Sequence, residues 1–142
     1  MPEYVMNFIR QTPKRLLYLM LGAYWTLIFA LTHTPSTTKL PSPQNDKLAH
    51  FIAYMGLAFL LGCVVLLKRR PLFTSFTIVM TVSLVYAITD EATQLLVAGR
   101  TAELWDVVAD MLGAAGGWVA SCLVVFLLGK VYCKPAKAQL SE

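Results

Sequence analysis

Four long apolar runs divide this sequence, and they restrict the chain to a few kinds of fold. The runs cover approximately residues 16–32, 47–67, 72–94 and 107–129. A helix rises 1.5 Å per residue, so about 20 residues cross the roughly 30 Å hydrocarbon core of a bilayer. An open strand edge would leave backbone groups unpaired in lipid. The sequence therefore predicts an all-α fold: a polytopic membrane protein built as a bundle of four transmembrane helices, with residues 1–142 forming one domain.

The composition agrees with lipid as the solvent. Of the 142 residues, 57% are hydrophobic and 14% are charged, whereas soluble domains have about 25% charged residues. The net charge of +4 comes from basic residues that flank the apolar runs. In such positions they set the topology and contact anionic lipid heads, so we expect the lipid bilayer as a partner and no nucleic acid.

The distribution of Lys and Arg predicts the orientation. With both termini in the cytoplasm, nine basic residues lie on the cytoplasmic side and three on the outer side, which satisfies the positive-inside rule. The outer three are Lys39, Lys47 and Arg100. The cytoplasmic nine are Arg10, Lys14, Arg15, Lys68, Arg69, Arg70, Lys130, Lys134 and Lys137. We also expect an aqueous, proline-containing loop over residues 32–46 and a frayed tail over residues 131–142.

The acidic residues are distributed the opposite way. Six of the eight lie on or near the predicted outer side, and they belong to three different spans or the turns beside them. They are Asp46, Asp90, Glu91, Glu103, Asp106 and Asp110. A charged side chain facing lipid costs about 2.5–3.5 kcal/mol at the bilayer centre, and less towards the interface. We therefore expect the acidic side chains to face a common interior between antiparallel neighbouring helices.

Helical spacing places further polar residues beside these acids. Asp46, His50 and Tyr54 are four residues apart, so they share one side of the second span, and Asp90 and Gln94 share one side of the third. The candidate ligand-binding set is Asp46, Lys47, His50, Tyr54, Asp90, Glu91, Gln94, Arg100, Asp106 and Asp110. His50 has two interpretations, a hydrogen-bonded interfacial histidine or a proton carrier or metal ligand.

The fourth span carries a small-residue pattern. Asp106 and Asp110 are followed along the same side by Gly113 and Gly117. Glycines at this spacing allow close helix packing, against another span of the chain or against a second copy in a homo-oligomer. The sequence does not decide between these two packing partners.

Three linked motifs resemble those of VanZ-like membrane proteins. Residues 46–54 match the pattern D-K-x-x-H-x-x-x-[YF]. Residues 90–117 match D-E-x-x-Q, then G-R, then D-x-x-A-N-x-x-G-x-x-x-G, except that Asp110 stands where the family commonly has Asn. The resemblance covers about residues 32–117. It implies a multi-pass protein of the bacterial cytoplasmic membrane, in a family named for a member linked to low-level resistance to the glycopeptide teicoplanin.

Three functions remain open at this point. The preferred interpretation is an outer polar pocket that binds a lipid-linked envelope precursor, a lipid head group or another anionic envelope ligand. The second is a membrane enzyme that acts on a lipid-linked phosphate with the help of Mg²⁺ or Ca²⁺, which carboxylate oxygens suit. The third is a structural or assembly protein in which the acids only join helices. The sequence identifies no catalytic residue, metal ligand or cofactor.

Overall fold

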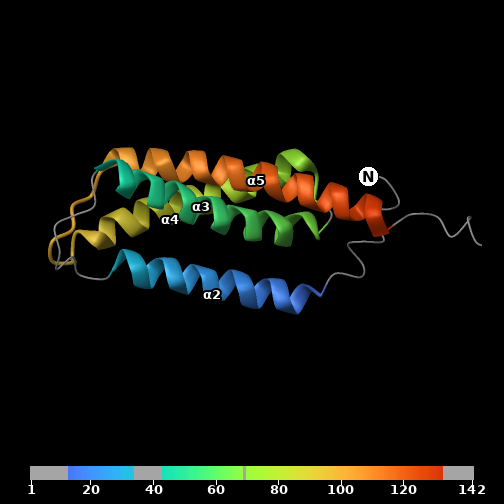
Figure 1. Cartoon of the computed structure of the whole chain (residues 1–142), viewed down its shortest axis with the longest axis horizontal. Helices are drawn as coiled ribbons and strands as arrows, with labels where there is room; N and C mark the ends of the chain where they lie inside the picture. The colour runs from blue at the N-terminus through green and yellow to red at the C-terminus, as the bar shows by residue number, and fades with distance from the viewer. Residues whose placement is uncertain (1–12, 34–42, 69, 133–142) are drawn as a thin grey trace, which may run out of the picture.

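The computed structural model of this chain describes residues 13–33, 43–68 and 70–132. Within these ranges the chain forms four helices, drawn in Figure 1. They are α2 (Lys14–Thr32), α3 (Pro43–Leu66), α4 (Leu72–Gln94) and α5 (Leu104–Tyr132). By length and hydropathy all four are candidate membrane spans. The predicted all-α fold with four long apolar helices is confirmed.

Three helices begin earlier than the sequence predicted, and α2 does so by two residues, at Lys14. α3 begins at Pro43, inside the predicted aqueous loop. Proline is well tolerated in the first turn of a helix, because the backbone N–H that it lacks would have no intrahelical partner there. α5 begins at Leu104, and Asp106 in its first turn places a negative charge at the positive end of the helix dipole.

The helices alternate in direction. Figure 1 shows α2 and α4 ending at the same end of the bundle where α3 and α5 begin. We call this the polar end. Gly99 in the connection from α4 to α5 has a φ of 80°, a left-handed conformation that glycine adopts without strain. The tight turn brings the end of α4 beside the beginning of α5.

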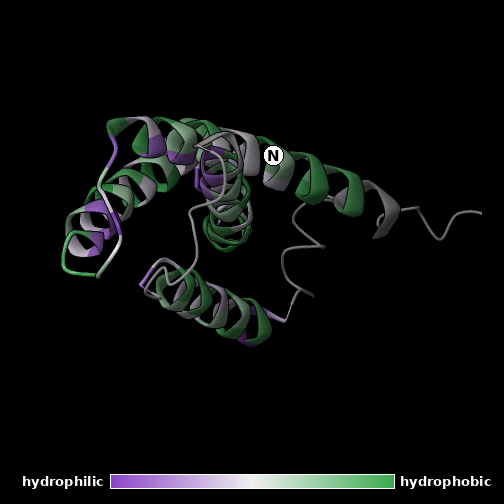
Figure 2. Cartoon of the chain, turned by 60° about the vertical axis from the view of Figure 1, so that its left-hand side comes forward, coloured by the Kyte–Doolittle hydropathy of each residue, from purple (hydrophilic) through white to green (hydrophobic). Residues whose placement is uncertain are grey.

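The four helices do not pack equally. α3 and α5 approach most closely, because Gly113 and Gly117 of α5 lie against the backbone of α3. A Cβ atom added to Gly117 would lie 2.8 Å from the backbone nitrogen of Phe59. α2 lies to one side of the other three in Figures 1 and 2, and Ile28 is its buried residue among those described.

Apolar residues face outward over most of the bundle, and polar residues lie inside. Figure 2 shows hydrophobic colour along most of the length of the helices. Phe73 is 81% exposed and Leu112 is 62% exposed, whereas Asp90 and Asp110 are 1% and 0% exposed. This arrangement suits a bundle surrounded by lipid, which solvates apolar side chains but not charges.

Parts of two predictions lie outside the described residues. These are most of the expected loop after the first span and nearly all of the expected C-terminal tail. The same is true of five of the basic residues used for the topology: Arg10, Lys39, Arg69, Lys134 and Lys137.

Candidate functional site

The polar end collects acidic side chains from α3, α4, α5 and the turn before α5. Asp46 and Asp106 lie in the first turns of α3 and α5, where the helix dipole stabilises a negative charge. Asp90 and Glu91 lie near the end of α4, where the dipole disfavours them. These two carboxylates are buried, so they depend on partners from other elements.

His50 of α3 connects the other two helices of the core. Its Nδ1 lies 3.0 Å from Oδ1 of Asp110 on α5, at hydrogen-bond distance. Its Nε2 lies 4.0 Å from Oε1 of Glu91 on α4. His50 is 7% exposed, Glu91 5% and Asp110 0%. A histidine between two buried carboxylates reduces the cost of keeping those acids out of water.

Asp90 is the contact point for α2. Its Oδ1 accepts a hydrogen bond of 2.9 Å from the hydroxyl of Thr32, and its Oδ2 accepts one of 2.9 Å from the side-chain amide of Gln94. His33, next to Thr32, places its Nε2 2.9 Å from the hydroxyl of Thr93 on α4. Hydrogen bonds therefore hold the end of α2 to α4.

Two cationic side chains lie nearer the surface of the polar end. Lys47, with a side chain 33% exposed, donates hydrogen bonds to Oε2 of Glu103 at 2.8 Å and Oδ1 of Asp106 at 3.1 Å. Arg100, with a side chain 20% exposed, lies 4.0 Å from Oδ1 of Asp46 and donates to the carbonyl oxygen of Leu31 at 3.4 Å. Both cations already have acidic partners.

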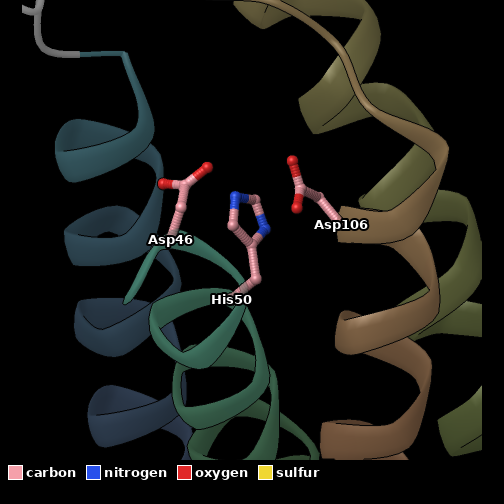
Figure 3. Close-up of side chains that lie close together, drawn as sticks. All are labelled: Asp46, His50 and Asp106. Carbon is pink, nitrogen blue, oxygen red and sulfur yellow. The ribbon is translucent and has the colours of Figure 1, made fainter. Parts of the chain in front are cut away.

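Asp46, His50 and Asp106 form a compact group, which we call the triad. One donor atom from each residue lies within 4.8 Å of the other two. Figure 3 shows Asp46 and His50 projecting from α3 and Asp106 from α5, around a shared space. Asp46 is half-buried, and the other two residues are buried. The donor set, two carboxylates and one imidazole, is one that binds divalent cations in proteins.

Three buried oxygen atoms near the triad have no hydrogen-bond partner among the described residues. They are Oε1 of Glu91, Oδ2 of Asp110 and the hydroxyl of Tyr54. The ring of Tyr54 stacks on that of Tyr86, with centroids 5.7 Å apart, and Trp25 meets Tyr86 edge-on at 5.1 Å. This aromatic layer lies deeper in the bundle than the acids, since Tyr54 follows His50 by one helical turn on α3.

All ten residues of the predicted ligand-binding set lie at the polar end or one turn below it. Asp46, Lys47, His50, Asp106 and Asp110 are joined across α3 and α5. Asp90 and Gln94 bond each other on α4, while Glu91 accepts a hydrogen bond of 2.9 Å from the backbone N–H of Glu103. Arg100 lies beside Asp46, with 4.0 Å between Nη1 and Oδ1.

Two residues that attach α2 beside the site, Thr32 and His33, were not predicted from the sequence. Both residues follow the first apolar run, and their side chains reach α4. The sequence did contain a signal for them, because they are polar residues at the end of a span that finishes on the same side of the membrane as the acids. Gly113 and Gly117 lie against α3 of the same chain.

Comparisons with known proteins agree with this arrangement of motifs. The family model described as VanZ/LLP1 matches residues 4–127, which include α2, α3, α4, most of α5 and every residue of the site. No curated protein and no solved structure gave a match. On the extent of the family match, the chain belongs to the VanZ/LLP1 family of multi-pass membrane proteins.

Proposed function

We propose that this protein lies in a bacterial cytoplasmic membrane with both termini in the cytoplasm, and that its polar end binds an anionic or lipid-linked envelope ligand from the outer leaflet. The excess of Lys and Arg on the opposite side supports this orientation. Ligands of this class carry phosphate or carboxylate groups at the membrane surface, the depth at which the polar end would lie.

One observation carries the proposal: two cations lie at the rim of a buried polar network. Lys47 and Arg100 are partly exposed, and the side chain of Glu103, which pairs with Lys47, is 49% exposed. Ion pairs this close to solvent contribute little to stability. An anionic group on a ligand competes with Glu103 and Asp46 for the two cations at small cost. Arg100 provides the planar donor group that binds phosphate or carboxylate in a bidentate manner.

A teicoplanin susceptibility assay tests this function. His50→Ala, Asp90→Ala and Arg100→Ala are expressed singly in a susceptible bacterium, beside the unaltered protein. The control is Lys68→Ala, which removes an exposed cation that contacts Tyr18 at the opposite end of the bundle. We expect the unaltered protein to confer resistance, the polar-end variants to lose it, and the control to retain it. Unchanged resistance in all three variants at normal protein levels would refute the proposal.

A structural role is the second candidate, because the polar contacts join all four helices. In this role the network needs complementary charges but no particular residue in each position. Exchanging the charges of Lys47 and Glu103 (Lys47→Glu with Glu103→Lys) then restores both folding and phenotype after either single change has lost them. Restored folding without the phenotype would instead favour ligand binding.

A further inference from the structure

The geometry points to a divalent cation site, of the Zn²⁺ class, formed by Asp46, His50 and Asp106 at the polar end. The three side chains converge from two helices, and one donor atom of each lies within 4.8 Å of the others. This inference deepens the proposed function and rests on it, because the cation would complete the site for an anionic envelope ligand.

The ring of His50 is oriented as in a metal-binding histidine. Its Nδ1 is taken by Asp110 Oδ1 at 3.0 Å, which leaves Nε2 as the nitrogen for a metal. Figure 3 shows one ring nitrogen of His50 turned towards Asp46. Histidine ligands commonly donate their other N–H to a carboxylate, which fixes the tautomer and raises the basicity of the ligating nitrogen. Asp110 is therefore a positioning residue for His50.

A fourth side chain, from α4, also points a buried oxygen without a hydrogen bond towards the triad. Oε1 of Glu91 is buried, has no hydrogen-bond partner among the described residues, and lies 4.0 Å from Nε2 of His50. Glu91 is 5% exposed. A buried carboxylate oxygen without a partner is costly, and this one is aimed at the nitrogen that would bind the metal. A cation on Nε2 would satisfy Glu91 directly or through a bound water.

The distances between the three donor atoms suit a site whose side chains move closer together when the ion binds. Zinc–ligand distances of about 2.0–2.2 Å place tetrahedral donor atoms about 3.4 Å apart. From separations of up to 4.8 Å, the donors must approach by up to about 1.4 Å. Asp46 can make this movement, since its side chain is 29% exposed and its contact with Arg100 is long, at 4.0 Å. Three protein ligands leave a fourth position open for water or a ligand oxygen.

The donor types select the class of metal. Imidazole suits Zn²⁺ and other first-row transition ions, whereas Mg²⁺ and Ca²⁺ prefer sites built of oxygen alone. Two carboxylates and one neutral imidazole match the ligand types and number of open zinc sites in other proteins. We therefore name Zn²⁺ rather than the Mg²⁺ or Ca²⁺ that the acidic residues alone suggested.

A bound cation would also reduce the electrostatic repulsion between the carboxylates of the polar end and an anionic ligand. Six carboxylates surround two cations at the polar end, so an added phosphate meets repulsion. A divalent ion on Asp46 and Asp106 neutralises both carboxylates. These are the partner of Arg100 and one of the two partners of Lys47, so Arg100 becomes available to the ligand and Lys47 keeps only its exposed contact with Glu103. The metal and the two cations together form a site for phosphate or carboxylate.

The test measures Zn²⁺ binding by the full-length protein in lipid nanodiscs, purified with a tag that contains no histidine. The chain has two histidines, so His50→Asn and His33→Asn form a matched pair. His33 lies at the same end but bonds Thr93 outside the triad. We expect one Zn²⁺ per chain by calorimetry, binding at least 100-fold weaker in His50→Asn, and unchanged binding in His33→Asn. Asp110→Asn weakens binding by about 10–100-fold.

A spectroscopic measurement keeps the inference falsifiable if His50→Asn fails to fold. In the folded His33→Asn protein loaded with Cu²⁺, His50 is the only imidazole, and pulsed electron paramagnetic resonance detects its remote nitrogen when the ring is coordinated. This signal supports the site. No Zn²⁺ binding, equal binding in the triad variants, or no imidazole signal overturns it.

The outcomes separate this inference from the proposed function. Teicoplanin resistance that depends on Arg100 in a protein without Zn²⁺ affinity overturns the metal site and leaves the function standing. Zn²⁺ binding that requires His50, in a protein whose polar-end variants keep full resistance, supports the metal site and overturns the function.

Discussion

Asp110 is fully buried in a membrane-spanning helix, and one of its two carboxylate oxygens has a partner among the described residues. That partner is His50, at 3.0 Å. An acid in such a position is expensive unless a neighbouring group balances its charge or shares its proton. His50 and Asp110 therefore form an energetically coupled pair, and removing either one takes away the hydrogen-bond partner of the other.

A double-mutant cycle on this pair tests their coupling. We expect His50→Leu and Asp110→Leu each to lower the free energy of unfolding by about 1–3 kcal/mol, because each leaves a buried polar group unpaired. The double variant should be more stable than either single variant, since neither member of the pair is then left buried without the other. Unfolding in mixed micelles with increasing SDS, followed by circular dichroism, measures these differences. Strictly additive losses would contradict the coupling.

At the scale of helices, α2 differs from the other three. It buries only Ile28 among its described residues, while Leu21, Tyr24 and Trp25 pack half-buried against the core. Polar contacts add to this attachment near its end and at Tyr24, whose hydroxyl donates to the carbonyl of Ala53 at 3.2 Å. The hydrogen bond from Thr32 to Asp90 is part of that attachment. Few buried apolar contacts imply low local stability, so α2 depends on its polar attachment more than α3, α4 or α5 does.

Removing Asp90, the hydrogen-bond acceptor on α4, should loosen the attachment of α2 more than the packing of the other helices. In Asp90→Leu, we expect faster hydrogen exchange of backbone amides in the last turns of α2, with little change in α3 and α5. The matched control is Thr89→Ala on the same helix, because Thr89 is exposed and its hydroxyl bonds only the backbone of α4. Exchange measured by mass spectrometry in nanodiscs distinguishes the two variants. Equal exchange in both would show that Asp90 does not hold α2.

On α5, the contact with α3 requires glycine at positions 113 and 117 and tolerates a side chain at position 116. A Cβ on Gly117 would overlap the carbonyl oxygen of Met55, whereas a Cβ on Gly116 comes no nearer than 3.9 Å to Met55. We expect Gly117→Ala to destabilise the protein by about 1–3 kcal/mol. Gly116→Ala should be neutral or slightly stabilising, because alanine favours the helix. SDS unfolding compares them, and similar effects in both variants would be evidence against this packing.

The sequence predicted most of the fold and the composition of the site, but not the pairings within it. Apolar run lengths indicated the four helices, and the spacing of Asp46 and His50 indicated a shared side of α3. Which acid His50 contacts depends on how α3 and α5 rotate about their axes, and that is decided by close packing at Gly113 and Gly117. The role of Thr32 depends on where α2 rests, which its weak apolar packing does not determine.

On the scale of the whole molecule, ionisable side chains lie largely at the two ends of the bundle. The buried acids, His50 and Arg100 lie at the polar end, while Lys14, Lys68 and Arg70 belong to the opposite end, where α2 and α4 begin and α3 ends. Between the ends, exposed side chains are largely apolar. In the proposed function, the ligand therefore reaches the polar end from one side of the membrane, and the orientation decides which compartment supplies it.

Single-cysteine labelling in intact cells determines that orientation. In a background without the native cysteines, Thr101→Cys lies in the α4–α5 connection at the polar end, and Arg70→Cys lies between α3 and α4 at the opposite end. Both positions are exposed, so the two variants are matched controls for each other. Because the positive-inside rule places both termini in the cytoplasm, a membrane-impermeant maleimide should label Thr101→Cys in intact cells and Arg70→Cys only after permeabilisation. The reverse pattern would place the polar end in the cytoplasm, where an outer-leaflet envelope ligand cannot reach His50 or Arg100.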